Sequence, residues 1–175
     1  LGVGDQSDPA LARVGIHVPA GRLSVAELRD LAGLADAYSA GEVRLTVEQN
    51  ALLPNVPREK LASLLAEPAL TLGRFSVDPG NVLANMVSCT GSQFCPLAII
   101  ETKTKAERVM GLVDDRVTSE KPIRVHWTGC PNSCGQVQAA DIGLMGAPAK
   151  RANAEGKMKA VAGVNIYVGG TIGEG

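Results

Sequence analysis

The sequence has 175 residues, of which 45% are hydrophobic and 20% are charged, values typical of a globular protein with a core of its own. Seventeen basic and 18 acidic residues leave a net charge of −1, which gives no support to nucleic-acid binding. No apolar run approaches the roughly 18 residues that a membrane-spanning helix needs, and no signal or transit segment is visible at the start. We therefore expect a globular protein with neither a nucleic-acid nor a membrane partner.

The first part of the chain carries the patterns of strands and helices in alternation. Residues 1–13 are rich in Gly, Asp and Pro and are predicted to be a linker. Alternating apolar residues then predict a strand over 14–18, and an apolar stripe predicts a helix over 24–41. Ser24 and Glu27 have the spacing of a capping box, which marks the start of that helix.

The next elements complete this first domain. Gly41 is the predicted stop of the helix, because glycine favours the left-handed conformation in which many helices end. Alternation predicts a second strand over 42–47, and residues 57–68 are predicted to form a short helix between two prolines. The β-α-β-α order over residues 14–78 resembles half of a ferredoxin-like α+β sandwich.

The second part of the chain changes character after residue 78, and all four cysteines lie beyond that point. A second domain, of the α/β class, is therefore predicted over residues 79–175. A helix is predicted over 96–113, directly after Cys95. Alternating apolar residues predict three strands, and a polar surface excursion separates the last two; in chain order these segments are 122–127, 140–145, 150–159 (the excursion) and 163–170.

The cysteines form two pairs, C-x5-C and C-x3-C, with 34 residues between them. Zinc sites mostly use pairs two to four residues apart, so the five-residue gap fits zinc poorly. Iron–sulfur clusters accept wider and more varied spacings, because a cubane presents a separate iron to each thiolate. Disulfides need an oxidising compartment, which nothing else in the sequence suggests. The spacing therefore favours a [4Fe–4S] cluster over zinc, and both over disulfides or free thiols.

The residues around the cysteines agree with an anionic group. Cys95 directly precedes the predicted helix, whose first backbone N–H groups can point at anionic sulfur. Three glycines near the cysteines are interpreted as sites where the backbone approaches a bulky inorganic core, because they lack a Cβ; they are Gly91, Gly129 and Gly135.

The segments "CTGSQFC", "AIIETK" and "HWTGCPNSCGQVQAADIGLMG" resemble the cluster-binding half of ferredoxin-dependent nitrite reductases, a branch of the sirohaem nitrite/sulfite reductase family. The preceding stretch, from "GIHVPAGRLSV" to "ALLPNV", is similar to the same enzymes. The resemblance runs from about residue 14 to residue 173, and both cysteine blocks match in spacing and in the residues between.

The resemblance implies that one [4Fe–4S] cluster is bound by Cys89, Cys95, Cys130 and Cys134. It also implies that Cys134 bridges to the sirohaem iron as its proximal axial ligand and is in that sense catalytic. A thiolate shared by cluster and haem would couple them electronically and push electron density onto the haem iron. In such enzymes the cofactor carries the chemistry, and the protein positions and tunes it.

The resemblance also implies an activity. The blocks "HWTGCPNSC", "QVQAADIGLMG" and "VEQN" are more similar to the nitrite branch than to the sulfite branch. The expected reaction is assimilatory reduction of nitrite to ammonia with reduced ferredoxin as electron donor, in the chloroplast stroma or in the cytoplasm of a bacterium. Sulfite reduction, a cluster-only electron-transfer module and a zinc-stabilised binding domain are the alternatives.

Several other residues resemble cofactor-contacting positions of the family. Thr46, Gln49 and Asn50 match a strand end that faces sirohaem, where amides could donate to haem carboxylates. The plain alternative is a polar strand terminus followed by a turn.

Two further groups are candidates for cofactor contact. The backbone amides of Asn132 and Ser133, between two ligands, are expected to point at cluster sulfurs. Gly170 and Thr171, with Gly169 before them, resemble a loop near the sirohaem carboxylates, although an ordinary hairpin end would show the same residues.

The remaining candidates are weaker. His17 and His126 lie in strand-like patterns and are interpreted as ordinary packed or exposed histidines rather than ligands. Trp127 is interpreted as core that shields the cluster. A basic group on the predicted helix could dock acidic ferredoxin, or could simply be a solvated face offset by Glu101 and Glu107; its members are Lys103, Lys105 and Arg108.

One expected part of an oxyanion reductase has no match in the sequence. Such an enzyme needs cations over the distal side of the haem, for which arginine is well suited. In the family these residues come from the amino-terminal half of the polypeptide. The first residue is Leu1 rather than Met, and the chain is expected to be a portion of a longer polypeptide whose other half is its partner. The 175 residues alone are expected not to reduce nitrite.

Overall fold

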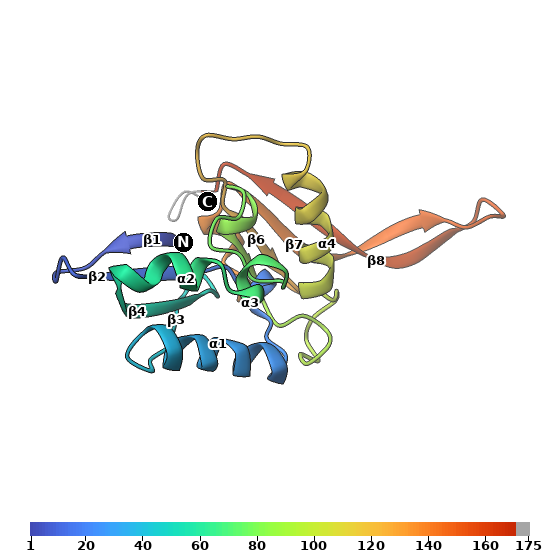
Figure 1. Cartoon of the computed structure of the whole chain (residues 1–175). Coiled ribbons are helices and arrows are strands. Elements are labelled where there is room, and N and C mark those ends of the chain that lie inside the picture. Colours follow the sequence, from blue (N-terminus) through green and yellow to red (C-terminus); the bar gives the residue numbers. More distant parts are fainter. Residues whose placement is uncertain (171–175) are drawn as a thin grey trace. The chain divides into compact units, whose positions relative to one another are not determined.

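The computed structural model describes residues 1–170, in which the chain forms two compact units that meet in sequence at Gly80 and Asn81. Each unit contains one four-stranded sheet within the described residues. The strand order is β1-β2-β4-β3 in the first unit and β5-β6-β7-β8 in the second, and helices accompany both sheets (Figure 1). The predicted α+β class is confirmed.

The first unit is an antiparallel sheet with helices packed on one face. Its strands are β1 (Gly2–Asp5), β2 (Leu11–Ile16), β3 (Arg44–Leu45) and β4 (Ala51–Pro57). Its helices are α1 (Val25–Tyr38), α2 (Leu61–Leu65) and α3 (Pro68–Thr71), with short 3-10 helices at Pro19–Gly21 and Arg58–Lys60. The core is a single cluster of buried apolar side chains, in which strand residues such as Ile16 and Leu53 pack with Leu31 of α1 and Leu64 of α2.

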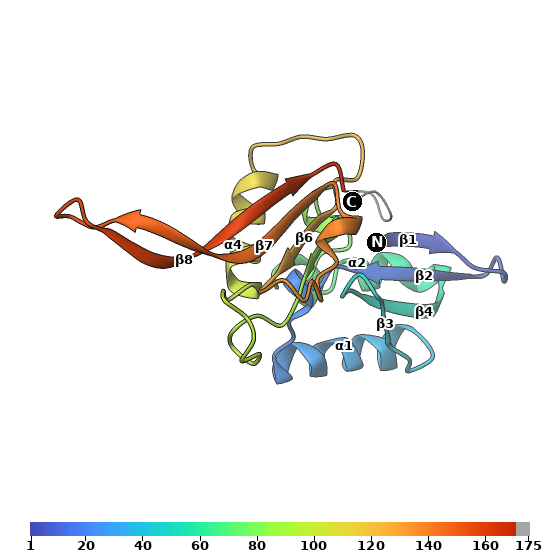
Figure 2. The same cartoon turned by 180° about the vertical axis from the view of Figure 1, so that it is seen from behind.

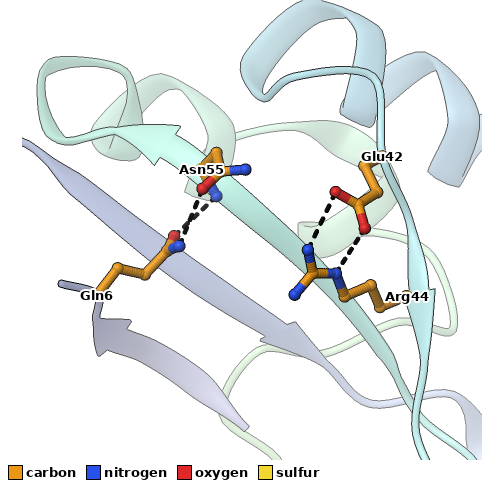
Figure 3. Close-up of polar contacts among 4 residues, drawn as sticks. All are labelled: Gln6, Glu42, Arg44 and Asn55. Atoms are coloured by element: carbon orange, nitrogen blue, oxygen red, sulfur yellow. Dashed lines mark hydrogen bonds and ion pairs between the residues drawn. The ribbon is translucent and has the colours of Figure 1, made fainter. Parts of the chain in front are cut away.

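The predicted linker over residues 1–13 is wrong, because β1 pairs with β2 from Gly2↔Gly15 to Asp5↔Ala12. Of the residues that suggested a loop, Gly2, Gly4 and Asp5 lie in β1, and only Asp8 and Pro9 lie in the turn between the strands. Figure 3 shows how that turn is tied to the sheet: the Gln6 amide donates to Asn55 Oδ1 at 2.9 Å, and the Asn55 N–H donates to Gln6 Oε1 at 2.7 Å. A short strand with two glycines carries no hydrophobic alternation for sequence reasoning to detect.

Helix α1 has the ends that the sequence predicts. The Ser24 hydroxyl accepts from the Glu27 backbone N–H, and the Glu27 carboxylate accepts from the Ser24 N–H, which completes the capping box. At the other end Gly41 has a φ of +74° and its N–H donates to the Ala35 carbonyl at 3.2 Å. Glycine reaches this left-handed conformation without the strain that a Cβ would bring.

The strand predicted over 42–47 is shorter in the structure. Strand β3 holds only Arg44 and Leu45, and Leu45 and Val47 are exposed (73% and 89%) instead of facing a core. A tight turn follows, in which the Thr46 N–H donates to the Asn50 carbonyl and Gln49 has a φ of +64°. Figure 3 shows the ion pair beside it, where the Arg44 guanidinium holds the pKa of Glu42 below its ordinary value.

Strand β4, which directly follows this turn, is the buried strand that alternation missed. Its sequence ALLPNVP is an almost unbroken apolar run, so it shows no period of two. Asn55 within it has a φ of +57°, and the register with β2 shifts between Ala12 and Val14. Beyond β4, the predicted helical segment 57–68 is confirmed as a 3-10 turn that leads into α2.

The second unit is a mixed sheet that joins parallel and antiparallel pairings. Strands β5 (Met86–Ser88), β6 (Val125–Thr128) and β7 (Ile142–Ala152) are parallel, and β8 (Met158–Val168) is antiparallel to β7. Helix α4 (Lys103–Asp114) lies between β5 and β6 in the chain, and 3-10 turns occur at Leu83–Asn85 and Val137–Ala139. Strand β5 was not predicted, because three residues are too few to show a pattern.

Strands β7 and β8 form one long hairpin, which extends well beyond the other strands of its sheet (Figure 2). The ladder continues without interruption to the pair Ala152↔Met158, and the chain turns at Asn153–Lys157. Half of the predicted surface excursion over 150–159 is therefore strand, and the other half is the turn. Its polar residues marked solvent exposure correctly but not the end of the strands.

The predicted helix over 96–113 is wrong at its start, because α4 begins only at Lys103. Backbone groups between Cys95 and α4 are used across loops: the Ile99 N–H donates to the Gly129 carbonyl at 2.7 Å, and the Ile100 carbonyl accepts from the Ser92 N–H at 3.0 Å. These bonds replace the i to i−4 bonds of a helix, so Cys95 does not stand at a helix N-terminus.

Candidate functional site

The four cysteines line one cavity of about 320 Å³ in the second unit. Cys89 and Cys95 lie in the loop that follows β5, and Cys130 and Cys134 lie in the loop that follows β6. Because β5 and β6 are paired and parallel, their carboxyl ends meet at the same edge of the sheet, and the two loops emerge side by side. Two sequence-distant cysteine pairs are thus brought to one place by strand pairing.

Backbone hydrogen bonds hold the two loops against each other. The Cys89 N–H donates to the Trp127 carbonyl at 3.0 Å, which extends the β5–β6 pairing into the loops. The Ile99 N–H donates to the Gly129 carbonyl at 2.7 Å farther along. Trp127 itself is buried, as predicted for a core residue beneath the site. The positions of the cysteines are therefore set by backbone contacts.

The glycines of the loops have a packing role within the protein. A Cβ on Gly135 would lie 2.1 Å from the Trp127 carbonyl oxygen, and a Cβ on Gly129 would lie 2.7 Å from Ala98 Cβ. Gly91 has a φ of +73° and faces Thr102. These close contacts are with protein atoms, so the glycines let the loops pack on one another. Gly91 and Gly129 also line the cavity, so their predicted role beside an inorganic core stays a prediction.

The four thiols differ in exposure. Cys130 is buried, Cys89 and Cys95 are half-buried, and Cys134 is exposed; all four are free thiols. The apolar side chains of Phe94 and Leu97 line the same cavity and are themselves largely exposed. The cavity therefore has a buried floor and an open side, and Cys134 is the thiol most accessible from outside.

The arrangement of the thiols suits a polynuclear group better than a single ion. Among residues 1–170, no three His, Cys, Asp or Glu side chains are grouped closely enough to hold one metal ion. A tetrahedral zinc site needs every thiolate at about 2.3 Å from one point. A cluster instead places a different iron next to each thiolate, so the ligands surround a volume. Four thiols spaced around one cavity fit the second pattern.

One thiol already accepts a backbone hydrogen bond. The Gly129 N–H donates to Cys89 Sγ at 3.1 Å, and the Thr102 hydroxyl donates to the Cys89 carbonyl at 2.6 Å. Sequence reasoning missed both contacts, because nothing in the spacing relates residues 102 and 129 to residue 89.

The residues between the second pair of cysteines are placed as follows. Asn132 lines the cavity. The Ser133 N–H donates to the Cys130 carbonyl at 3.2 Å within a turn, so the prediction that this amide points at a cluster sulfur is wrong for Ser133. His126 lies outside the cavity lining, and its Nδ1 is 3.0 Å from the Gln136 carbonyl oxygen.

The other predicted cofactor contacts lie elsewhere in the two units. Thr46, Gln49 and Asn50 form the β3–β4 turn of the first unit, where Asn50 is buried and Thr46 Oγ1 accepts from its N–H. Gly170 lines a second hollow of about 360 Å³, together with residues of the β7–β8 hairpin such as Met145 and Tyr167. Thr171 lies outside the described residues.

Both units of the chain match known protein families. The model described as "Nitrite and sulphite reductase 4Fe-4S domain" matches residues 79–175, more than half of the chain. The model described as "Nitrite/Sulfite reductase ferredoxin-like half domain" matches residues 5–70. The chain belongs to the nitrite and sulfite reductase family. Its two matched segments correspond to the two units of the fold.

Relatives of this family extend over nearly the whole chain. Ferredoxin–nitrite reductase from Zea mays, a chloroplastic protein, is 54% identical over 173 residues, and the one from Synechococcus elongatus is 51% identical. Both matches cover 99% of the chain. They cover only 30% and 32% of the relatives, so the chain spans about a third of their length. The predicted resemblance to part of a longer reductase is confirmed.

Solved structures share this fold. The NirA protein of Mycobacterium tuberculosis superposes with a TM-score of 0.84 at 30% identity, over 96% of this chain and 30% of that one. A dissimilatory sulfite reductase superposes with a TM-score of 0.64 at 18% identity, over 83% of this chain and 35% of that one, which shows the fold alone.

Proposed function

We propose that the chain is the part of a ferredoxin-dependent assimilatory nitrite reductase that binds a [4Fe–4S] cluster and the proximal side of sirohaem. The complete enzyme would reduce nitrite to ammonia. The observation that carries the proposal is the single cavity lined by all four cysteines, in the unit that matches the 4Fe-4S domain of the family. The relatives named as ferredoxin–nitrite reductases support nitrite as substrate and reduced ferredoxin as electron donor.

Each cysteine has a proposed place in this site. Cys89, Cys95 and Cys130 would bind the cluster alone, from the more enclosed side of the cavity. Cys134 would bind the cluster and also the sirohaem iron, for which its exposure at the open side is suited. When bound, the two cofactors supply single-electron transfer and an iron at which nitrite is reduced. The protein contributes the thiolates, the hydrogen bond to Cys89 Sγ and the buried side chain of Trp127.

Further cofactor contacts remain part of the proposal. Asn132 lines the cluster cavity, and Gly170 with Thr171 would approach the sirohaem carboxylates. Thr46 and Gln49 are proposed to face sirohaem from the β3–β4 turn. Asn50 is proposed with them, although its side chain is already engaged within the first unit.

The relatives support the proposed setting and partners. Chloroplastic enzymes from Zea mays and Arabidopsis thaliana and an enzyme from Synechococcus elongatus support the chloroplast stroma or a bacterial cytoplasm. Within residues 1–170, no helix has both the length and the apolar character to cross a bilayer. We propose that the remaining two thirds of such an enzyme supply the cations that bind the substrate anion.

The deciding experiment measures cofactors and turnover in the purified holoprotein. Iron, acid-labile sulfide and the sirohaem absorption bands are quantified in the wild type and in four variants, each with one cysteine changed to serine. We expect C89S, C95S and C130S to lose iron and sulfide, and C134S to lose sirohaem as well. Ser133→Ala, between two of the ligands, is the control and should retain both cofactors.

The same preparations distinguish the alternatives. Nitrite and sulfite are assayed with reduced ferredoxin, because the fold is shared with a sulfite reductase and does not separate the two substrates. Faster turnover of sulfite than of nitrite would assign the other branch. A protein with a cluster but without sirohaem bands would be an electron-transfer module. A colourless protein that contains zinc would overturn the proposal altogether.

A further inference from the structure

Thr102 is completely buried, and its hydroxyl bonds to the loop that carries Cys89. The residue is the N-cap of α4, a position where a threonine hydroxyl normally accepts a backbone N–H of the first helical turn. Here that bond is absent from the described helix, and the hydroxyl instead donates to the Cys89 carbonyl at 2.6 Å. The Glu101 carboxylate takes over the cap, because it accepts the N–H groups of Thr104 (3.1 Å) and Lys105 (3.3 Å).

The loop that carries Cys89 is shaped around this hydroxyl. Gly91 approaches so closely that a Cβ there would lie 2.5 Å from Thr102 Oγ1, and its φ of +73° favours glycine independently. The Ser88 carbonyl, one residue before Cys89, accepts from Lys103 Nζ at 3.2 Å. Two successive carbonyls, at the end of β5 and at the start of the loop, are therefore held by two successive residues at the start of α4.

The opposite side of Cys89 faces the second cysteine loop. There the Gly129 N–H donates to Cys89 Sγ at 3.1 Å, and the Cys89 N–H donates to Trp127. The Thr102 oxygen lies 3.8 Å from the same sulfur, but its one hydroxyl hydrogen is directed at the carbonyl. Thr102 thus acts on the sulfur indirectly, by fixing the backbone that places Sγ against the Gly129 amide.

We propose that Thr102 is a positioning residue that sets the reduction potential of the cluster through Cys89. This inference rests on the proposed function, because it requires the cluster. A hydrogen bond to a cluster thiolate stabilises the reduced state, which carries the additional negative charge, and so raises the potential. If the hydroxyl is removed, the Cys89 carbonyl loses its side-chain donor while the N–H bond to Trp127 remains, the Gly129 N–H···Sγ bond weakens, and the potential falls.

The test is a redox titration of the cluster in the holoprotein, followed by EPR, for the wild type, Thr102→Val and Thr102→Ser. Valine keeps the shape of threonine and removes the hydroxyl, whereas serine keeps the hydroxyl. We expect the ratio of reduced to oxidised cluster in T102V to be about tenfold smaller at the wild-type midpoint, a shift of about 59 mV for one electron. T102S should titrate with the wild type. The exposed Thr118→Val is the matched control and should not shift.

A second measurement serves if T102V does not retain its cluster. Pulsed EPR of reduced wild-type and T102S protein labelled with ¹⁵N-glycine should show a glycine amide nitrogen coupled to the cluster. The absence of any such coupling would overturn the inference, as would a T102V protein whose cluster has the wild-type potential. A holoprotein without iron and sulfide is a different result, because it refutes the proposed function itself.

Discussion

Asn50 shows at the scale of one residue how a predicted cofactor contact can be tested against a structural role. Its side-chain oxygen accepts the Val18 N–H at 3.0 Å and lies 3.1 Å from His17 Nδ1, and its amide nitrogen donates to the Glu48 carbonyl at 3.2 Å. Asn50 is itself buried, and its amide connects the segment just after β2 to the β3–β4 turn. Its polar groups are largely engaged inside the first unit.

We therefore predict that Asn50→Ala mainly reduces stability. Removing the amide leaves the buried Val18 N–H without its partner, which costs about 1–3 kcal/mol in the free energy of unfolding. Urea denaturation of the variant and of a control at an exposed asparagine, Asn165→Ala, measures this. A variant with wild-type stability and reduced sirohaem content would instead support the cofactor role that the family resemblance implies.

At the scale of elements, the cap of α1 links stability to pH. The pKa of Glu27 is lowered from its ordinary value of 4.5, mainly because the Ser24 backbone N–H donates to its carboxylate, with a further contribution from the Arg74 guanidinium at 2.8 Å. A carboxylate whose pKa is lower in the folded state stabilises the fold above its ordinary pKa. That contribution is lost as the pH falls through the lowered value.

We predict that Glu27→Gln is less stable than the wild type at neutral pH and that the difference shrinks in acid, below about pH 4.5. Glutamine can still occupy the capping box, so the helix start is retained while the charge is lost. Thermal unfolding at a series of pH values measures the difference. A gap between the two proteins that stays constant into strong acid would show that the charge of Glu27 contributes nothing.

The elements also show what sequence patterns can and cannot predict. The ends of α1 were predictable because capping box and C-terminal glycine are local, and their bonds join residues a few positions apart. The start of α4 was not, although Pro96 suggested one. The Ile99 amide bonds to the other cysteine loop, and such a partner has no signature in the neighbouring sequence. Strands β1 and β5 were not predicted, because they are short and carry no alternation of apolar residues.

At the scale of the whole molecule, the site too combines features that the sequence predicts with contacts that only the folded chain shows. The cysteine spacing favoured a cluster, and the family resemblance indicated which residues belong together. The cavity that joins them arises from the parallel pairing of β5 and β6, which sequence alone did not contain. Thr102 and the Gly129 amide were missed for the same reason, since their contact with Cys89 exists only once the loops have met.

The chain by itself is predicted not to turn over nitrite. It spans about a third of its reductase relatives, and an oxyanion reductase needs cations beside the substrate that the family resemblance assigns to the other part of the polypeptide. The 175 residues, loaded with cluster and sirohaem under anaerobic conditions, are assayed with reduced ferredoxin against the complete enzyme. Measurable nitrite reduction by the isolated chain would show that the substrate cations lie within it.

The basic residues of α4 are candidates for the docking of ferredoxin. Of the three basic residues predicted as a group, Lys103 is directed to the Ser88 carbonyl, whereas Lys105 and Arg108 are exposed on α4. Val109 and Leu112, on the same helix, are exposed as well. Because α4 begins next to Cys89, an acidic donor bound to this face would lie close to the proposed cluster.

We predict that neutralising both charges, in Lys105→Gln/Arg108→Gln, slows ferredoxin-dependent turnover several-fold at low ionic strength and flattens its salt dependence, since steering by exposed charges is screened by salt. The matched control removes two cations from the β7–β8 hairpin, in Arg151→Gln/Lys159→Gln. Turnover with a small chemical reductant should be unchanged in both variants, because it bypasses docking. An unaltered salt profile in the α4 variant would place the ferredoxin site elsewhere on the enzyme.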